Sequence, residues 1–248
     1  MLARNASGIR EKAAELGELG YPFVIVSGEK LSLPHVVYRE PKGKFDAINF
    51  GLGFVPPATD VVAFNDVDTT IHNLEDALQL IHNKSVSLVF VRVDVKKGPQ
   101  LMFYSILDLL RKRIPIAASG ELMLIKYDFL KRMMPLYPCK AEDSYILFKC
   151  LENGGKTVFC DKCYVVTKRT TLAKQEEAYK RRTVGGIYQA LSLTKPPVLV
   201  RLFYTLLPFL SSLLLVLGRR GFYWSKGILL GYVDYIRGDK ASSWIPSY

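Results

Sequence analysis

The chain has 248 residues, of which 49% are hydrophobic, enough to fill one α/β domain and an appendage. Its 34 Lys and Arg against 23 Asp and Glu give a net charge of +11, which suits an anionic partner. The basic residues lie beside apolar segments and not among exposed stacking aromatics, which argues against a nucleic-acid binder. No secretory signal pattern opens the chain, and four cysteines without framework spacing indicate a reduced, cytoplasmic setting.

Helical and strand patterns alternate through the first half of the chain. Apolar residues at helical spacing in 6–20 predict a helix, and the apolar run 22–28 predicts a buried strand. The next predicted elements are a strand at 35–40, a helix at 44–55, and strands at 60–68 and 85–95. This alternation predicts an α/β fold with a largely parallel mixed sheet flanked by helices.

The predicted strand at 60–68 ends in two aspartates, Asp66 and Asp68, one residue apart. In open α/β sheets ligands bind beyond the carboxyl ends of strands. Two neighbouring carboxylates repel each other unless a cation neutralises them, and their oxygens suit Mg²⁺ or Mn²⁺ carrying substrate phosphates. The alternative is a solvated turn in which Asp68 caps the next helix.

Four ordered segments resemble the inverting family-2 glycosyltransferases, which have a nucleotide-sugar-binding α/β fold. The resemblance covers roughly residues 20–190. It is carried by Gly43, Lys44, Ala47 and Asn49, by Asp66 and Asp68, by 119–130, and by Glu142 with Asp143.

The resemblance implies a role for each matched residue. Asp66 would touch the nucleotide or donor sugar, and Asp68 would bind a divalent cation that stabilises the leaving diphosphate. Asp143 would be the general base toward an acceptor hydroxyl, and Glu142 would help to bind or orient the acceptor. Without the other segments, Glu142 and Asp143 read as the cap and first-turn acid of a helix at 144–155.

The donor-side roles have alternatives too. Lys44 is expected to meet a donor phosphate or to be solvated, and Asn49 to bind the base or a turn. Arg182 matches an arginine that helps to hold the donor diphosphate, although Arg181 and Arg182 also read as a membrane-facing basic cluster. The tryptophan that usually follows this arginine is Thr183 here, which favours transfer of a single sugar over processive synthesis.

The N-terminal region departs from the family pattern. The chain begins where the family's first strand ends, so that strand is expected to be absent. The family's base-binding aspartate after the second strand is replaced by Ser27, Gly28 and Glu29, with Glu29 as a substitute. These departures motivate the alternative of a catalytically degenerate binding or scaffolding subunit.

Cys160 and Cys163 form a Cys-x-x-Cys pair, but Cys139 and Cys150 are too far apart in sequence to complete a usual zinc site. Buried thiols are therefore favoured over zinc or redox chemistry. His72 follows the aspartates closely enough to approach a metal, although a helix-start role is preferred.

After a basic, loop-like run from about Lys168, the chain ends in an apolar tail. The uncharged stretch 202–218 is at the lower limit for crossing a bilayer, and 221–238 has the pattern of an interfacial helix. The alternative is that both helices pack on a soluble domain.

The sequence thus predicts a catalytic domain at 1–195, on the cytoplasmic side, and a membrane-associated helical tail at 196–248. The predicted activity is transfer of a hexosyl or N-acetylhexosaminyl group from a nucleotide sugar to a glycan or polyprenyl-lipid acceptor in cell-envelope synthesis.

Overall fold

The computed structural model describes residues 2–3, 7–95, 101–168 and 172–238. The chain divides into two compact units. Unit 1 comprises residues 1–93, 119–138 and 156–167, and unit 2 comprises 94–118, 139–155 and 168–248.

Unit 1 contains a small parallel sheet near its N-terminus. Its elements are β1 (Leu2–Ala3), α1 (Ile9–Glu18), β2 (Ile25–Ser27), β3 (Val36–Tyr38) and α2 (Lys44–Leu52). The strand order is β1-β2-β3, and both pairs of strands are parallel. The fully buried Ile9 and Ile25 form a small core between α1 and this sheet. The chain was expected to begin where the first strand of the family ends. At this place the structure has β1, whose two residues pair with β2.

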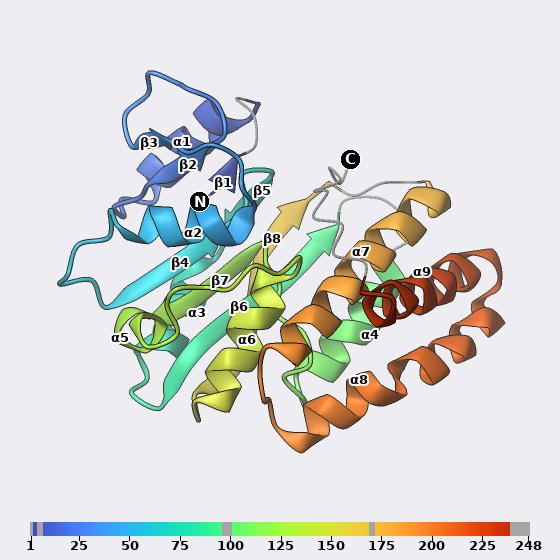
Figure 1. Cartoon of the computed structure of the whole chain (residues 1–248). Helices are drawn as coiled ribbons and strands as arrows, with labels where there is room; N and C mark the ends of the chain where they lie inside the picture. The colour runs from blue at the N-terminus through green and yellow to red at the C-terminus, as the bar shows by residue number, and fades with distance from the viewer. Residues whose placement is uncertain (1, 4–6, 96–100, 169–171, 239–248) are drawn as a thin grey trace. The chain divides into compact units, whose positions relative to one another are not determined.

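A second, five-stranded sheet completes unit 1, with strand order β4-β7-β6-β8-β5 (Figure 1). Its strands and flanking helices are β4 (Val61–Asn65), β5 (Thr69–His72), α3 (Leu74–His82), β6 (Val86–Val95), β7 (Leu122–Lys126), α5 (Tyr127–Lys131) and β8 (Lys156–Thr167). β7 runs antiparallel to β4 and β6, and β5 runs antiparallel to β8.

The α/β class and the mixed character of the sheet are confirmed, but the parallel part is smaller than expected. It is confined to β1–β3 among the pairs whose direction is established. The prediction extended the parallel pattern because strands separated by helices usually are parallel. It missed β5, a four-residue strand that was read as the start of a helix.

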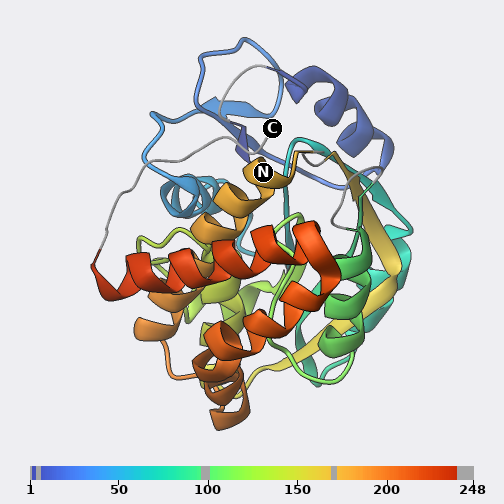
Figure 2. The same cartoon turned by 90° about the vertical axis from the view of Figure 1, so that its right-hand side faces the viewer.

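Unit 2 is mainly helical. Its elements are α4 (Leu101–Arg111), α6 (Glu142–Glu152), α7 (Ala173–Ser192), α8 (Val198–Leu210), the 3₁₀ helix η1 (Ser211–Leu217) and α9 (Gly218–Ile236). Figure 2 shows α9 lying across α7, against which it packs. The basic run after Lys168 was therefore wrongly read as a loop, because α7 occupies most of it.

Glycines inside α7 and α9 allow the two helices to approach closely. A Cβ atom at Gly231 of α9 would lie 2.5 Å from the carbonyl oxygen of Arg181 and 3.0 Å from the amide nitrogen of Gly185. A Cβ atom at Gly186 would lie 2.8 Å from the backbone nitrogen of Ala141, just before α6. Gly185 and Gly186 are tolerated within α7 because they permit close approach of α9 on one side and of the start of α6 on the other.

By length and composition, the helical stretch Val198–Ile236 is long and apolar enough to cross a membrane. The stretch is not straight, because Gly218 has φ 67 between η1 and α9 and the chain reverses there (Figure 1). α8 and η1 leave large apolar side chains exposed, which we call the apolar face. Its members are Val198, Leu199, Leu202, Leu206, Phe209, Leu210, Leu213, Leu215, Val216 and Leu217.

The predicted division into domains 1–195 and 196–248 stays a prediction. In the structure α8 and α9 fall in unit 2 together with α7.

Candidate active site

Asp66 and Asp68 lie in the short connection between β4 and β5. Asp68 does not cap a helix, because β5 follows it and α3 begins only after Asn73. The helix-capping alternative is therefore wrong, and so is the helix-start role of His72, whose ring stacks on Tyr164 of β8 with centroids 4.8 Å apart.

A network of hydrogen bonds holds this connection. The side-chain amide of Asn65 donates to Oγ1 of Thr69 at 2.9 Å and to the carbonyl of Glu121 at 2.6 Å. Thr69 Oγ1 donates to the carbonyl of Asp66 at 2.9 Å, and the amide of Asp66 donates to the carbonyl of Glu121 at 3.2 Å. These bonds fix the backbone that carries the two carboxylates.

Three of the four segments that carry the family resemblance meet at Asp66 in unit 1. Lys44, the first residue of α2, places its ammonium 2.8 Å from Oδ1 of Asp66. The same ammonium lies 3.5 Å from the carbonyl oxygen of Gly120 in the segment 119–130. Lys44 thus links the Asp66 carboxylate to a backbone carbonyl that lies 76 positions after Lys44 in the sequence.

α1 supports the same connection from another direction. The side chain of Lys12, only 1% exposed, donates to the carbonyl of Thr69 at 2.8 Å and to Glu15 at 3.0 Å. Glu15 in turn accepts a 2.7 Å hydrogen bond from the amide of Ile71. Burial lowers the pKa of Lys12, while Glu15, Asp66 and Asp68 act electrostatically in the opposite direction.

Sequence reasoning missed Lys12 and Glu15. Nothing in the pattern of α1 distinguishes Lys12 from the solvated lysines of an amphipathic helix, and its contact with Thr69 spans 57 positions.

The other predicted donor-side residues of unit 1 have different surroundings. Glu29 is exposed just beyond β2, and its amide donates to Oγ of Ser27 at 3.0 Å. Both amide atoms of Asn49 pair with the backbone of Leu136, at 3.0 and 2.9 Å. Asn49 thus holds the irregular segment that follows α5.

Arg39 orients the start of α2 relative to β3. Its guanidinium binds Asp46 through two hydrogen bonds of 2.8 and 2.9 Å. These hydrogen bonds lower the pKa of Asp46 and raise that of Arg39. Lys44 is thereby held on a helix whose first turn is fixed to the preceding strand.

Unit 2 carries the predicted acceptor-side residues. Glu142 and Asp143 occupy the first turn of α6, where negative charge is favoured by the helix dipole. Glu142 is 8% exposed, and Oδ1 of Asp143 accepts a 2.7 Å hydrogen bond from the amide of Ser144. α6 begins after Ala141, which provides no side-chain cap.

The two arginines of α7 face different partners. Arg181 binds Asp234 of α9 through two hydrogen bonds of 2.5 and 2.7 Å, so it fastens α9 to α7. The guanidinium of Arg182 lies 5.8 Å from the ring centroid of Tyr179.

The sulfur atoms have no ligand-like arrangement among the described residues. Cys150, Cys160 and Cys163 are buried free thiols, and burial raises the pKa of Cys139, Cys150 and Cys163 to about 12. Thiols with such pKa values stay protonated near neutral pH.

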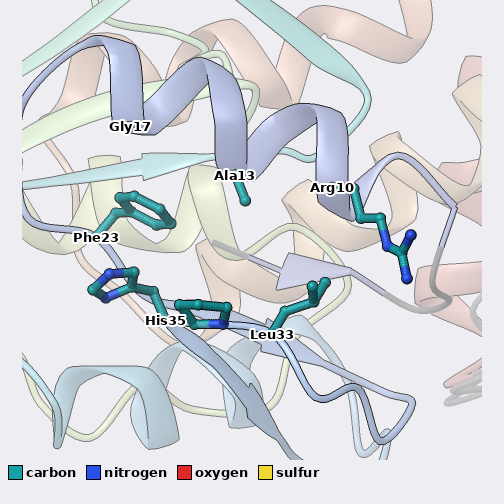
Figure 3. Close-up of a pocket in the computed structure, with 7 residues that line it drawn as sticks. Arg10, Ala13, Gly17, Phe23, Leu33 and His35 are labelled. Carbon is teal, nitrogen blue, oxygen red and sulfur yellow. The ribbon is translucent and has the colours of Figure 1, made fainter.

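A hollow of about 530 Å³ lies between α1 and the segment before β3 (Figure 3). It is lined by Arg10, Ala13 and Gly17 of α1 and by Phe23, Leu33, Pro34 and His35. Phe23 precedes β2 and His35 precedes β3, so the hollow is at the amino ends of these strands. The candidate active site is elsewhere, because Glu29 and Asp66 follow the carboxyl ends of β2 and β4.

The two aspartates fit a divalent cation by the chemistry of their donor atoms. No group of three His, Cys, Asp or Glu side chains within the described ranges is arranged to hold a metal. Two carboxylates on one turn are nevertheless suitable oxygen ligands for Mg²⁺ or Mn²⁺ when substrate phosphates supply the rest. Oδ1 of Asp66 is paired with the ammonium of Lys44.

A scan against protein-family models gave no match, and a search of curated protein sequences gave none either. Solved structures do match. The mannosyltransferase PcManGT from Pyrobaculum calidifontis, solved with GDP-Man and Mn²⁺, aligns with a TM-score of 0.74 at 17% identity, covering 96% of this chain and 86% of its own. GalNAc-T7, solved with UDP, GalNAc and Mn²⁺, aligns with a TM-score of 0.56 at 13% identity, covering 95% of this chain and 55% of its own. The chain therefore has the fold of the nucleotide-sugar glycosyltransferases, as the sequence resemblance implied.

Proposed function

We propose that this protein is a divalent-cation-dependent glycosyltransferase that moves a sugar from a nucleotide-diphospho-sugar to an acceptor hydroxyl or lipid phosphate, with inversion. The observation that carries the proposal is the meeting of Lys44, Gly120 and Glu121 around Asp66. Together with Asp66, these residues belong to three of the four segments that resemble one enzyme family.

On the donor side, Asp66 contacts the nucleotide or the sugar and Asp68 binds the cation. Lys44 and Arg182 bind the diphosphate, and Glu29 takes the place of the aspartate that holds the base. Asn49 supports the site by holding the backbone of Leu136. The exposed position of Glu29 beyond β2 supports its assignment, because ligands of such folds bind beyond the strands' carboxyl ends.

A bound Mg²⁺ or Mn²⁺ would stabilise negative charge on the leaving diphosphate. Asp66 and Asp68 would hold it. The presence of Mn²⁺ in the mannosyltransferase and GalNAc-T7 structures supports this assignment.

On the acceptor side, the Asp143 carboxylate takes the proton of the acceptor hydroxyl as the hydroxyl oxygen attacks the anomeric carbon. The attack comes from the side opposite the leaving diphosphate, which inverts the configuration. Glu142, one residue earlier in α6, helps to orient the acceptor. The acceptor class we propose is a glycan or polyprenyl lipid of the cell envelope.

The apolar face of α8 and η1 is proposed to lie in the surface of a membrane, with the active site on the cytoplasmic side. Val198, Phe209 and Val216 are 77%, 74% and 85% exposed, an unusual display of apolar surface for a soluble chain. Arg201, Arg219 and Arg220 are exposed beside them and suit anionic headgroups.

The rest of the tail stays with unit 2 in this proposal. Tyr204 of α8 is 3% exposed and its hydroxyl donates to the carbonyl of Ile116. Arg181 and Asp234 fasten α9 to α7. These contacts favour interfacial attachment over a helix that crosses the bilayer.

The activity is tested by a thermal-shift screen of nucleotide sugars on the full chain in detergent, with and without Mn²⁺. A donor present at 100 times its Kd stabilises the protein by about 2.7 kcal/mol. We expect at least one nucleotide sugar to stabilise the protein only when Mn²⁺ is present. We expect Asp68→Ala to lose this Mn²⁺-dependent stabilisation. Asp128→Ala is the matched control, because the Asp128 side chain is 83% exposed on α5.

Stabilisation of equal size without a cation would remove Asp68 from the site. Donor binding with no sugar transfer to any acceptor would instead support the degenerate binding subunit.

A further inference from the structure

Lys44 contacts one oxygen of Asp66, one of the two carboxylates that we assign to the divalent cation. Its ammonium is 2.8 Å from Oδ1 of Asp66, and the two side chains are only 21% and 28% exposed. A carboxylate oxygen in direct contact with an ammonium is less available to a cation from solution, because the two positive charges compete for it.

The backbone before Lys44 favours this placement. Gly43 has φ 112, a conformation that side-chain-bearing residues rarely adopt, and it directly precedes α2. Lys44 therefore starts the helix at a position fixed by a glycine, with its ammonium also 3.5 Å from the carbonyl oxygen of Gly120.

A second ammonium acts on the same pair of carboxylates. The buried Lys12 attracts both Asp66 and Asp68 electrostatically, although its own hydrogen bonds go to Thr69 and Glu15. The side chain of Lys12 is 1% exposed and that of Lys44 is 21% exposed, so a change of partner by Lys44 disturbs less packing. Among the described residues, one buried and one partly exposed ammonium thus act on the two aspartates.

We propose that Lys44 neutralises Asp66 until a nucleoside diphosphate arrives, and that it then moves to the diphosphate while the cation takes its place on Asp66. This inference rests on the proposed function. Its consequence is an order of binding in which the cation alone binds weakly and the cation with the diphosphate binds tightly. The diphosphate promotes the exchange because it offers Lys44 a new anion and offers the cation further oxygen ligands.

The test measures Mn²⁺ binding from the EPR signal of free Mn²⁺, with the full chain in detergent, alone and with ADP, CDP, GDP or UDP. For the wild type we expect weak Mn²⁺ binding alone and binding at least about tenfold tighter with one of the nucleotides. Lys44→Gln should bind Mn²⁺ alone at least about tenfold more tightly than the wild type and should bind the nucleotide more weakly.

Two control variants separate this effect from a general change of charge. Lys42→Gln removes the same charge two residues earlier, where the ammonium is 3.5 Å from Glu40 and the side chain is 56% exposed, so it should behave as the wild type. Lys44→Arg keeps a cation beside Asp66 and should keep weak Mn²⁺ binding in the absence of nucleotide. Lys44→Met provides a second neutral variant should Lys44→Gln not fold.

Equal binding of Mn²⁺ alone by the wild type and the folded neutral variants, with nucleotide still tightening it, would overturn this inference and leave the proposed function intact. A gain of the same size in Lys42→Gln would also overturn it. If the wild type binds neither Mn²⁺ nor any of the four nucleotides, the proposed function and this inference are both overturned.

Discussion

Lys12 donates a 2.8 Å hydrogen bond to the carbonyl of Thr69, and the two residues lie 57 positions apart in the sequence. Thr69 begins β5, which is at the edge of the five-stranded sheet. An edge strand presents backbone groups that need partners other than a neighbouring strand. Lys12 and Glu15 satisfy the carbonyl of Thr69 and the amide of Ile71, so α1 replaces the missing neighbour next to the two aspartates.

Lys12→Met should therefore destabilise the fold, because it leaves the carbonyl of Thr69 without its buried donor. The expected loss is about 1–3 kcal/mol in the free energy of unfolding, measured by denaturant unfolding of the full chain in detergent. Arg10→Met is the control, because Arg10 is exposed on the same helix. Equal stability of the two variants would show that the Lys12 hydrogen bond contributes nothing.

Gly231→Ala should also destabilise, for a steric reason. The added methyl carbon would lie 2.5 Å from the carbonyl oxygen of Arg181, so α9 has to move away from α7. Overpacking of this kind typically costs about 1–3 kcal/mol. Gly17→Ala in α1 is the matched control, since its methyl group meets no atom within 4 Å and it should stabilise the protein by about 0.5–1 kcal/mol. A stabilising effect of both substitutions would contradict the close contact between the helices.

The sequence predicted the local elements of unit 1 well, because each has a strong pattern of its own. The helix at α2 and the strands β2, β3, β4 and β6 were all expected from apolar periodicity. β5 was missed because four residues are too few to separate a strand from a helix start. α7 was missed because Gly185 and Gly186 look like loop residues unless the close neighbours Gly231 and Ala141 are known.

Only those residues of the candidate site that belong to sequence motifs could be predicted. Asp66, Lys44 and the segment 119–130 were selected separately, and the structure brings these three together. The partners that hold them were not predictable, since Lys12, Asn65 and Thr69 carry ordinary side chains whose importance comes from tertiary contacts.

Glu176 should make the stability of the protein depend on pH. It is fully buried, with Oε1 accepting a 2.6 Å hydrogen bond from Nε1 of Trp224, and burial raises its pKa above the ordinary value of 4.5. The folded state then binds the proton more tightly than the unfolded chain, so this contribution to stability is complete below the unfolded pKa and is lost as pH rises through the folded pKa.

Glu176→Gln should remove the loss of stability that accompanies rising pH. It should also raise the unfolding temperature near neutral pH, because no charge has to be buried. Glu177→Gln is the control, since its carboxylate pairs with Lys226 at 3.0 Å and Glu176 is left in place. Thermal unfolding at a series of pH values checks the prediction. An unchanged pH profile in Glu176→Gln would show that Glu176 is not its source.

The apolar face can be tested by vesicle sedimentation. Burying a large apolar side chain is worth about 1.5–3 kcal/mol, so the double variant Phe209→Asp, Val216→Asp should weaken binding to anionic lipid vesicles by at least about 100-fold. Tyr137→Asp is the control, because Tyr137 is 60% exposed in unit 1 and outside this face. Equal sedimentation of the double variant and the wild type would remove α8 and η1 from the membrane contact.

Asp143→Asn should separate sugar transfer from donor binding. Asn keeps the shape of the side chain, and its amide oxygen can still accept the hydrogen bond from the amide of Ser144, but it cannot accept a proton from the acceptor. Transfer should fall by about 10²–10⁴-fold, the usual contribution of a positioned general base, while the affinity for the donor stays within about twofold. Steady-state rates with saturating acceptor and a separate donor-binding titration provide the two measurements. Asp128→Asn, which changes an exposed carboxylate on α5, should alter neither. If Asp143→Asn loses donor affinity as strongly as Asp68→Ala and turns over any bound donor at the normal rate, Asp143 is a donor ligand or a structural residue and the base must be sought elsewhere.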